Sequence, residues 1–362
     1  EIAFILGFLV FSSYKSKIQS DAQLSNSNVS DKINIENANI YKIFYFLTSV
    51  LFLISQLLFY ILGGIPLFSE KSKIEIYSSI GPVYKINLAL TILMIYLVFC
   101  NYVYKYRKTT LIDGLIAFAL ILSLILNGGK SGLLNIVFIS TLSTAYYYHI
   151  NKEMYFLITE KMKKFNLIII SIALPVAMLV AAINTGDMSL LGGVKSLFFR
   201  VASFGDTFYM TTDYFLKFYK TKDYLSEGLF YIFGDVLRSL HLISLSEMPV
   251  PLGYQLMNNV YGTNFIGITG PNARHNLIAY LLFRPPFNFI FSFSLGLLLS
   301  FVRNFLFFRL PKNFIGGLIY VGLFISFYSV NTDITLSITS FTSLFAVTVP
   351  IFMLSLLIAK TK

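Results

Sequence analysis

Long apolar runs with almost no charge are the feature that most constrains the fold of this chain of 362 residues. A helix needs ~17–25 consecutive apolar residues to cross a bilayer. A soluble chain carries about a quarter charged residues, whereas this chain carries 12%. We therefore expect an all-α polytopic membrane protein with about nine or more transmembrane helices. The expected spans are residues 1–13, 42–62, 86–104, 111–126, 132–149, 166–184, 287–303, 313–330 and 334–358.

Basic residues in alternate loops orient these spans, because Lys and Arg near span ends stay in the cytoplasm. The long segment 185–286 then faces outward, to the periplasm of a bacterium, and joins the transmembrane helices of 1–184 to those of 287–362. It mixes apolar and polar residues, so we expect amphipathic helices at the outer membrane interface. The chain enters an apolar run at Glu1 without a methionine, so we expect an N-terminal piece to be missing. The residues assigned to the cytoplasm are Lys105, Arg107, Lys108, Lys152, Lys161, Lys163, Lys164, Arg303, Arg309, Lys312, Lys360 and Lys362.

The chain lacks the residues that several classes of protein need for their function. No expected span holds a charged residue or a histidine near its middle, which disfavours a proton-coupled transporter. The single cysteine, Cys100, and three scattered histidines disfavour a thiolate or zinc site, and we expect no metal and no cofactor. The formal net charge of +11 is divided between membrane edges and the outer segment, which disfavours a nucleic-acid partner.

Two stretches of the outer segment place charged and polar residues among apolar ones. In "GLFYIFGDVLRSLHLISL", Asp235, Arg238 and His241 recur at every third residue, which predicts one polar stripe along an otherwise apolar helix. The stripe is either part of a binding site or a hydrogen-bonded structural triad, and the sequence favours neither.

The second stretch is "GITGPNARHN", which combines a chain break with adjacent functional groups. Pro271 predicts that a helix begins here. Helix N-termini favour anions, and Arg274 adds a guanidinium able to bind phosphate in a bidentate manner. His275 follows as a candidate base, and Asn272 belongs to the same stretch.

Three more basic residues are expected on the outer side. Lys130 lies in the "NGGKSG" turn, Arg200 within "LFFRVASF", and Arg284 before two prolines. Each also has an ordinary interpretation: Lys130 as the cap of a turn, and Arg200 and Arg284 as anchors at the membrane interface.

These groups favour one kind of chemistry. The chain has no evident pair of carboxylates at glycosidase spacing and no G-x-S-x-G motif. Arginines with a histidine suit group transfer from a polyprenyl pyrophosphate: the arginines stabilise the departing pyrophosphate, and the histidine takes a proton from the acceptor hydroxyl.

The chain resembles the O-antigen polymerases (Wzy), which polymerise oligosaccharide repeat units for bacterial surface polysaccharides. The resemblance rests on many spans, a long outer loop late in the chain with arginines in it, the turn "NGGKSGLL" and the closing stretch "GPNARHNLIAYLLF". Lys130 stands where such proteins often have arginine.

The resemblance implies a metal-independent, inverting glycosyltransferase of the GT-C type in the bacterial inner membrane, with its active site facing the periplasm. It would transfer the growing glycan from undecaprenyl pyrophosphate onto a lipid-linked repeat unit, with membrane lipid and a chain-length regulator protein as further partners. Arg274 and Arg238 would bind the pyrophosphate, His275 or His241 would be the base, and Arg200 would position the second lipid or its sugar.

Three alternatives remain open. An O-antigen ligase has the same architecture and donor but uses lipid A–core as acceptor. A polysaccharide flippase or other transporter would place its charges along a central pathway. A scaffold protein would not need basic groups among aromatic residues on one side.

Overall fold

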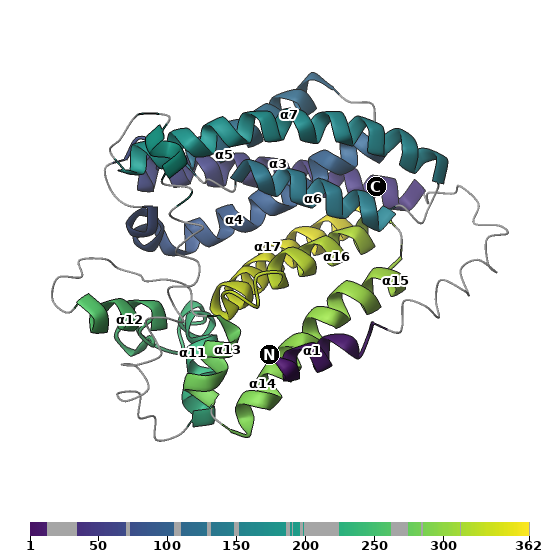
Figure 1. Ribbon diagram of the computed structural model, residues 1–362. Coiled ribbons are helices and arrows are strands. Elements are labelled where there is room, and N and C mark those ends of the chain that lie inside the picture. The colour runs from purple at the N-terminus through teal and green to yellow at the C-terminus, as the bar shows by residue number, and fades with distance from the viewer. Residues whose placement is uncertain are drawn as a thin grey trace. The chain divides into compact units, whose positions relative to one another are not determined.

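The computed structural model contains only helices as regular elements in the residues that it describes, so the expected all-α class is confirmed for that part of the chain (Figure 1). The described residues are 1–12, 35–69, 73–104, 110–128, 132–147, 152–185, 189, 191–195, 198, 224–261, 274–283, 285–311 and 313–361.

Each of the expected apolar runs contains a helix. The longer helices are α1 (Ile2–Leu9), α3 (Ile35–Gly63), α4 (Lys73–Tyr104), α5 (Leu111–Leu126), α6 (Gly132–Tyr147), α7 (Lys152–Thr185), α11 (Tyr224–Ser239), α12 (Leu252–Tyr261), α14 (Phe287–Ser300), α16 (Phe314–Phe327) and α17 (Ile334–Lys360). The short ones are the 3₁₀ turn η2 (Leu245–Glu247), α13 (His275–Ile278), the π-helical turns η4 (Ala279–Phe283) and η5 (Phe301–Leu306), and α15 (Phe307–Arg309).

Four helices among the described residues are long and apolar enough to cross a membrane, which indicates a membrane-embedded helical protein. Three further apolar helices, α5, α6 and α16, are shorter. The expected total of about nine spans and the GT-C architecture therefore stay predictions. The four long segments are Asn39–Gly63, Ser79–Tyr102, Phe287–Arg309 and Ile334–Lys360.

Helix α3 buries several polar side chains beside aromatic ones and exposes a row of apolar side chains. Gln56 and Ser55 are buried, where Gln56 Nε2 donates to Asn87 Oδ1 of α4 at 3.1 Å and Asn87 Nδ2 donates to Ser55 Oγ at 3.3 Å. Leu57 and Ile61 on the other side are exposed by 61% and 67%. Lipid tails are as apolar as leucine, so such helices are held together by interhelical hydrogen bonds and packing. The arrangement supports a membrane environment for α3 and α4.

The chain divides into two compact units, and neither is a continuous segment, because α16 and α17 each contribute to both. The expected division at residues 184 and 286 concerns the two sides of a membrane and stays a prediction. The first unit comprises Glu1–Val29, Ala202–Leu310 and Leu323–Thr342, and the second Ser30–Val201, Pro311–Gly322 and Ser343–Lys362.

In the second unit, two buried tyrosines fix the start of α16. Tyr146 of α6 donates its hydroxyl hydrogen to the Pro311 carbonyl at 3.0 Å, and Tyr96 of α4 donates to the Phe314 carbonyl at 2.7 Å. Buried phenol groups usually find such a partner. These bonds join segments distant in sequence within the second unit.

In the first unit, two glycines bring α1 and α14 into backbone contact. A Cβ atom on Gly7 would collide with the Phe293 carbonyl, and one on Gly296 would collide with the Phe4 carbonyl. Small residues permit this close approach of membrane helices. The contact matters for the site below, because Phe4 also touches one of its residues.

The core of the first unit surrounds the segment that follows Arg274. Leu277, Ile278, Leu281, Leu282 and Phe283 are all buried. Burial removes the apolar surface of these side chains from water and so stabilises the position of the segment. The core is completed by Ile232, Leu252, Leu256, Leu295, Val330 and Ile334.

Candidate functional site

Arg274 lies at the N-cap position of α13, so a helix does begin in the stretch where the sequence predicts one. Its backbone is extended (φ −67°, ψ 157°), and its carbonyl accepts hydrogen bonds from the N–H groups of Leu277 and Ile278, both at 3.0 Å. The α-helical part ends at Ile278 and continues as the π-helical turn η4. Because α13 is only one turn long, its dipole contributes little, and the expected role of Arg274 in binding an anion rests on its guanidinium and stays a prediction.

Two groups of His275, its backbone N–H and its ring, contact one carbonyl in the loop between α16 and α17. Its backbone N–H donates to the Asn331 carbonyl at 3.1 Å, and its Nδ1 lies 3.4 Å from the same oxygen. A carbonyl oxygen only accepts, so we assign the hydrogen of the neutral ring to Nδ1. The lone pair of that tautomer is on Nε2, as a general base requires.

The Nε2 atom of His275 is buried and has no hydrogen-bond partner among the residues that the structure describes. The His275 ring packs against Phe4, with ring centroids 4.8 Å apart. Burial lowers the pKa of His275 below its ordinary value, while the bond to the Asn331 carbonyl acts in the opposite direction. The ring is therefore neutral at pH 7, with its lone pair free to accept a proton.

Asn331 is a site residue that the sequence did not reveal. It contributes its backbone carbonyl, an atom that every residue has, so no side-chain pattern identifies it. Its loop is shaped by Asp333, whose Oδ1 accepts from Thr335 Oγ1 at 2.7 Å and from the Leu336 N–H at 2.9 Å, as an N-cap residue does. The contact places the loop between α16 and α17 beside His275.

The prediction of one polar stripe along α11 is wrong for His241. The helix ends at Ser239, and His241 lies beyond it. The His241 N–H donates to the Arg238 carbonyl at 2.9 Å, and the Leu242 N–H donates to the Leu237 carbonyl at 2.9 Å. His241 has a φ of 58°. These features define a Schellman motif with His241 at the C′ position, where glycine is usual. His241 is exposed and serves as the C-terminal cap of α11.

Asp235 and Arg238 have different environments. Asp235 Oδ2 accepts a hydrogen bond from Thr339 Oγ1 of α17 at 2.7 Å, so Asp235 ties α11 to α17. Arg238, in the last turn of α11, is exposed. Asp235 thus fits the structural interpretation, while Arg238 is accessible to a ligand.

The structure thus joins His275 to the loop before α17, and Asp235 to the second turn of α17. Arg200, Lys130, Arg284 and Asn272 lie outside the described residues, and their expected roles stay predictions. Within the described ranges, no group of three or more His, Cys, Asp or Glu side chains could hold a metal ion.

The arrangement suits proton abstraction beside an anion. A neutral histidine with a fixed tautomer accepts a proton at Nε2, and the neighbouring guanidinium stabilises negative charge on a phosphate. Comparison of the chain with protein-family models, with curated proteins and with solved structures gives no match.

Proposed function

We propose that this chain is a membrane-embedded glycosyltransferase that polymerises lipid-linked glycan repeat units at the outer face of the bacterial inner membrane. The observation that carries the proposal is the His275 side chain, with its tautomer set by the Asn331 carbonyl and its Nε2 without a partner. Arg274 immediately before it supplies a cation, and the four long apolar helices provide the membrane context in which a polyprenyl donor is found.

In the proposed reaction, the hydroxyl oxygen of the incoming repeat unit attacks the anomeric carbon of the growing glycan. The bond between that carbon and the pyrophosphate oxygen breaks, and the leaving group keeps the electron pair. His275 Nε2 takes the hydroxyl proton. Arg274 and Arg238 bind the pyrophosphate and stabilise its developing charge. Arg200, Lys130, Arg284 and Asn272 complete the binding of donor and acceptor in this proposal.

His275 is preferred over His241 as the base. His241 already has a structural explanation as the cap of α11, and its exposed ring has ordinary access to water. His275 has a buried Nε2 and a lowered pKa. A base that must be unprotonated near neutral pH works better when the charged form is disfavoured.

The test is a gel of surface glycans from a bacterial strain that lacks the gene and carries plasmid-encoded variants. With Arg274→Ala we expect glycans capped with a single repeat unit in place of the long ladder. The matched control is Arg309→Ala, which removes a guanidinium assigned to the cytoplasmic side; its Cζ atom lies 5.7 Å from the centroid of the Phe305 ring. Loss of that cation–π contact costs roughly 0.5–1 kcal/mol, and the ladder should remain.

A normal ladder from Arg274→Ala, at a membrane level equal to that of the wild type, would refute the role given to Arg274. The strain without the gene separates the alternatives. Single repeat units on the surface support a polymerase. Loss of all attached glycan, single units included, would instead support the ligase. Accumulation of lipid-linked units on the inner face would support the flippase.

A further inference from the structure

Helix α11 has three distinct sides, and they suit three different surroundings. Leu225, Leu229 and Phe233 follow each other at intervals of four residues and are exposed. At 3.6 residues per turn they drift by only ~40° per step and so form one apolar stripe. Leu240 and Leu242, just beyond the helix, are exposed as well; the five side chains are exposed by 40% to 67%.

A second side of α11 packs against the rest of the first unit. Ile232 is buried, and a Cβ on Gly228 would lie 2.9 Å from the Phe283 ring of η4. Asp235 accepts its hydrogen bond from α17 on this side. The packed side therefore has protein partners, and it lies about a quarter of a turn from the apolar stripe.

The third side is polar and exposed at its two ends, while Gly234 between them is buried against Pro249. It carries Glu227 and Arg238, which lie close to one line along the helix, about three turns apart. This polar edge lies about half a turn from the apolar stripe. A helix in a membrane interface needs opposed apolar and polar sides of this kind, and the packed side between them attaches α11 to the protein.

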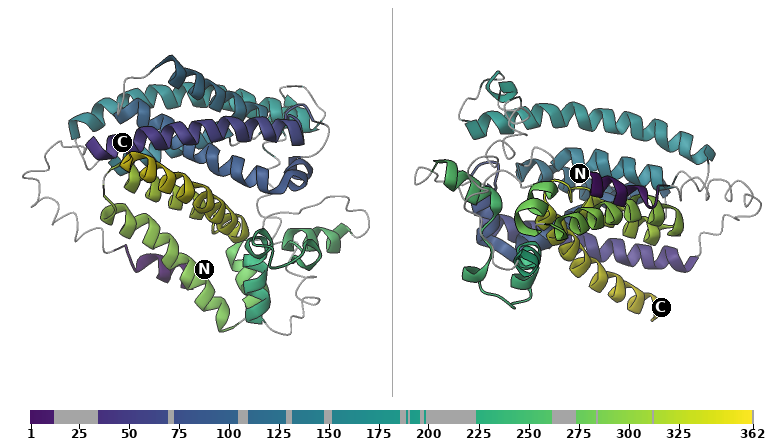
Figure 2. Two further views of the ribbon diagram at one scale, coloured as in Figure 1. Left: turned by 180° about the vertical axis from the view of Figure 1, so that it is seen from behind. Right: turned by 60° about the horizontal axis from the view of Figure 1, so that its bottom comes forward.

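The packed side of α11 lies next to the segment that leads into a membrane span. Phe283, which meets Gly228 of α11, stacks on Phe291 of α14 with ring centroids 4.3 Å apart. Phe289 and Ile290 in the first turns of α14 are exposed. Figure 2 shows α11 crossing the direction of α14 instead of running beside it, as expected of a helix in the membrane plane next to a helix that crosses it.

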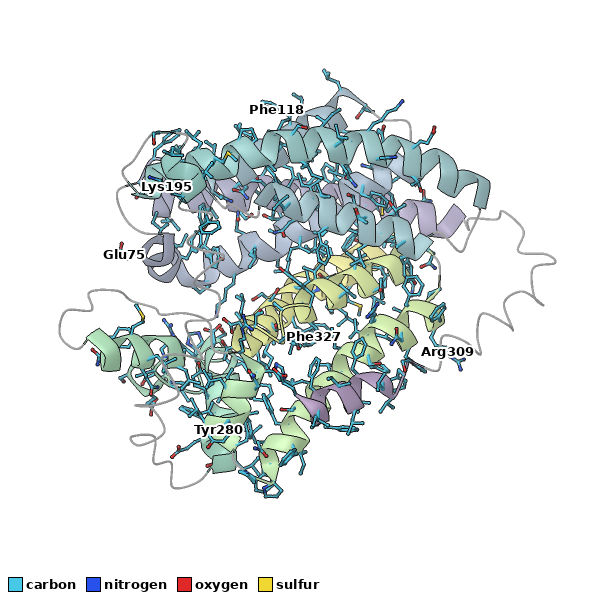
Figure 3. All side chains as sticks on the ribbon, in the orientation of Figure 1. Glu75, Phe118, Lys195, Tyr280, Arg309 and Phe327 are labelled. Carbon is cyan, nitrogen blue, oxygen red and sulfur yellow. The ribbon has the colours of Figure 1, made fainter. Side chains whose placement is uncertain are left out.

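An exposed tyrosine lies in η4, the turn that leads into α14. Tyr280 of η4, labelled in Figure 3, is 53% exposed. Tyrosine is enriched where a membrane span meets water, because its ring is apolar and its hydroxyl is polar. Helix α11, η4 and the first turns of α14 thus each expose apolar or aromatic side chains near the beginning of the span.

We propose that α11 lies in the lipid–water interface of the bilayer. Its stripe of Leu225, Leu229 and Phe233 contacts the acyl chains, and Glu227 and Arg238 lie at the level of the headgroups. The occupant of the apolar stripe is thus phospholipid, because α11 packs on η4, which leads directly into the span that begins at Phe287. The proposal does not depend on the glycosyltransferase function.

The chain contains no tryptophan, so one introduced residue reports its own surroundings. Phe233→Trp would be reconstituted into phosphatidylcholine vesicles whose acyl chains carry bromine either near the carbonyl end or near the methyl end. We expect roughly a halving of its emission with the shallow bromines and a clearly smaller loss with the deep ones, because interfacial helices lie ~5–10 Å into the acyl boundary. Acrylamide in the aqueous phase should quench it weakly.

Three further variants make the result decisive. Leu229→Trp, one turn away on the same stripe, should behave as Phe233→Trp does and replaces it if that variant fails to fold. Glu227→Trp, on the polar edge, should be quenched by acrylamide and little by bromine. Phe289→Trp of α14 is the positive control for lipid contact. Strong quenching of Phe233→Trp and Leu229→Trp by acrylamide would overturn the proposal, and so would protection from both quenchers, which would mean that protein covers the stripe.

Discussion

His241 occupies the only non-glycine position among the described residues with a positive φ. A non-glycine residue loses roughly 1–2 kcal/mol in the left-handed region, whereas glycine adopts it freely but has more conformational freedom to lose on folding. No residue pattern predicts that α11 ends here, because neither glycine nor proline follows Ser239 directly. The repeat of polar residues at every third position therefore extended the expected stripe beyond the real end of the helix.

We predict that His241→Gly leaves the protein as stable as the wild type or stabilises it by up to about 1 kcal/mol, because glycine suits the C′ position. His241→Val should destabilise it by roughly 1–2 kcal/mol, because a β-branched residue fits a positive φ poorly. Thermal unfolding in detergent measures both. The glycan ladder should persist in His241→Gly, and its loss at normal protein level would restore His241 as the candidate base.

Burial of the His275 ring links folding stability to pH. The folded-state pKa lies below the ordinary value of 6.5, so the unfolded chain binds the proton first as the pH falls. Stability contributed by the neutral ring is present above that value and is lost as the pH falls through the window below it. His275→Asn keeps an N–H group near the position of Nδ1 but has no titrating ring.

We predict that His275→Asn loses less thermal stability than the wild type between about pH 7.5 and about pH 5. It should also abolish the ladder at every pH, because the Nε2 lone pair is gone. Melting temperatures of the two proteins across this range provide the measurement. Parallel melting curves would show that the His275 ring does not titrate differently on folding.

At the level of elements, the contact between α1 and α14 depends on glycine. Gly296→Ala places a methyl group against the Phe4 carbonyl, so the helices must move apart. We expect a loss of about 1–3 kcal/mol, as for other overpacked contacts. Gly114→Ala is the matched control: Gly114 lies in α5 and a Cβ there meets nothing within 4 Å. That control should gain up to about 1 kcal/mol from helix propensity.

Thermal unfolding of the two variants under the same detergent conditions provides the comparison. Equal stability of Gly296→Ala and wild type would show that α1 and α14 are not packed through Gly296. Because His275 also touches Phe4, the Gly296→Ala protein should show a changed pH dependence of stability as well.

Helix positions could be predicted from the sequence because a span requires ~20 apolar residues, and such runs are visible without any structure. The π-helical turns η4 and η5 could not, since they reflect how a helix fits its neighbours and not its composition. The bond from Thr339 to Asp235 joins residues 104 positions apart. Such a pairing follows from tertiary packing, which a single sequence does not reveal.

At the scale of the whole molecule, the orientation in the membrane remains the prediction on which the site depends. Arg274 and His275 could be picked out because a chain break precedes two functional groups. Their assignment to the outer side rests on the positive-inside rule alone. If the orientation were reversed, these residues would face the cytoplasm, where the polymerisation proposed here does not take place.

The single cysteine of the chain makes this orientation directly testable, because Cys100 is fully buried and should be inert to water-soluble reagents. Ser246→Cys introduces a thiol at an exposed position of the outer segment, and Thr361→Cys introduces one after α17. We predict that a membrane-impermeant maleimide labels Ser246→Cys in cells with a permeabilised outer membrane. It should label Thr361→Cys only after the inner membrane is opened, because Lys360 and Lys362 keep that end in the cytoplasm. The opposite pattern would place the Arg274–His275 site on the cytoplasmic side and exclude the proposed polymerase.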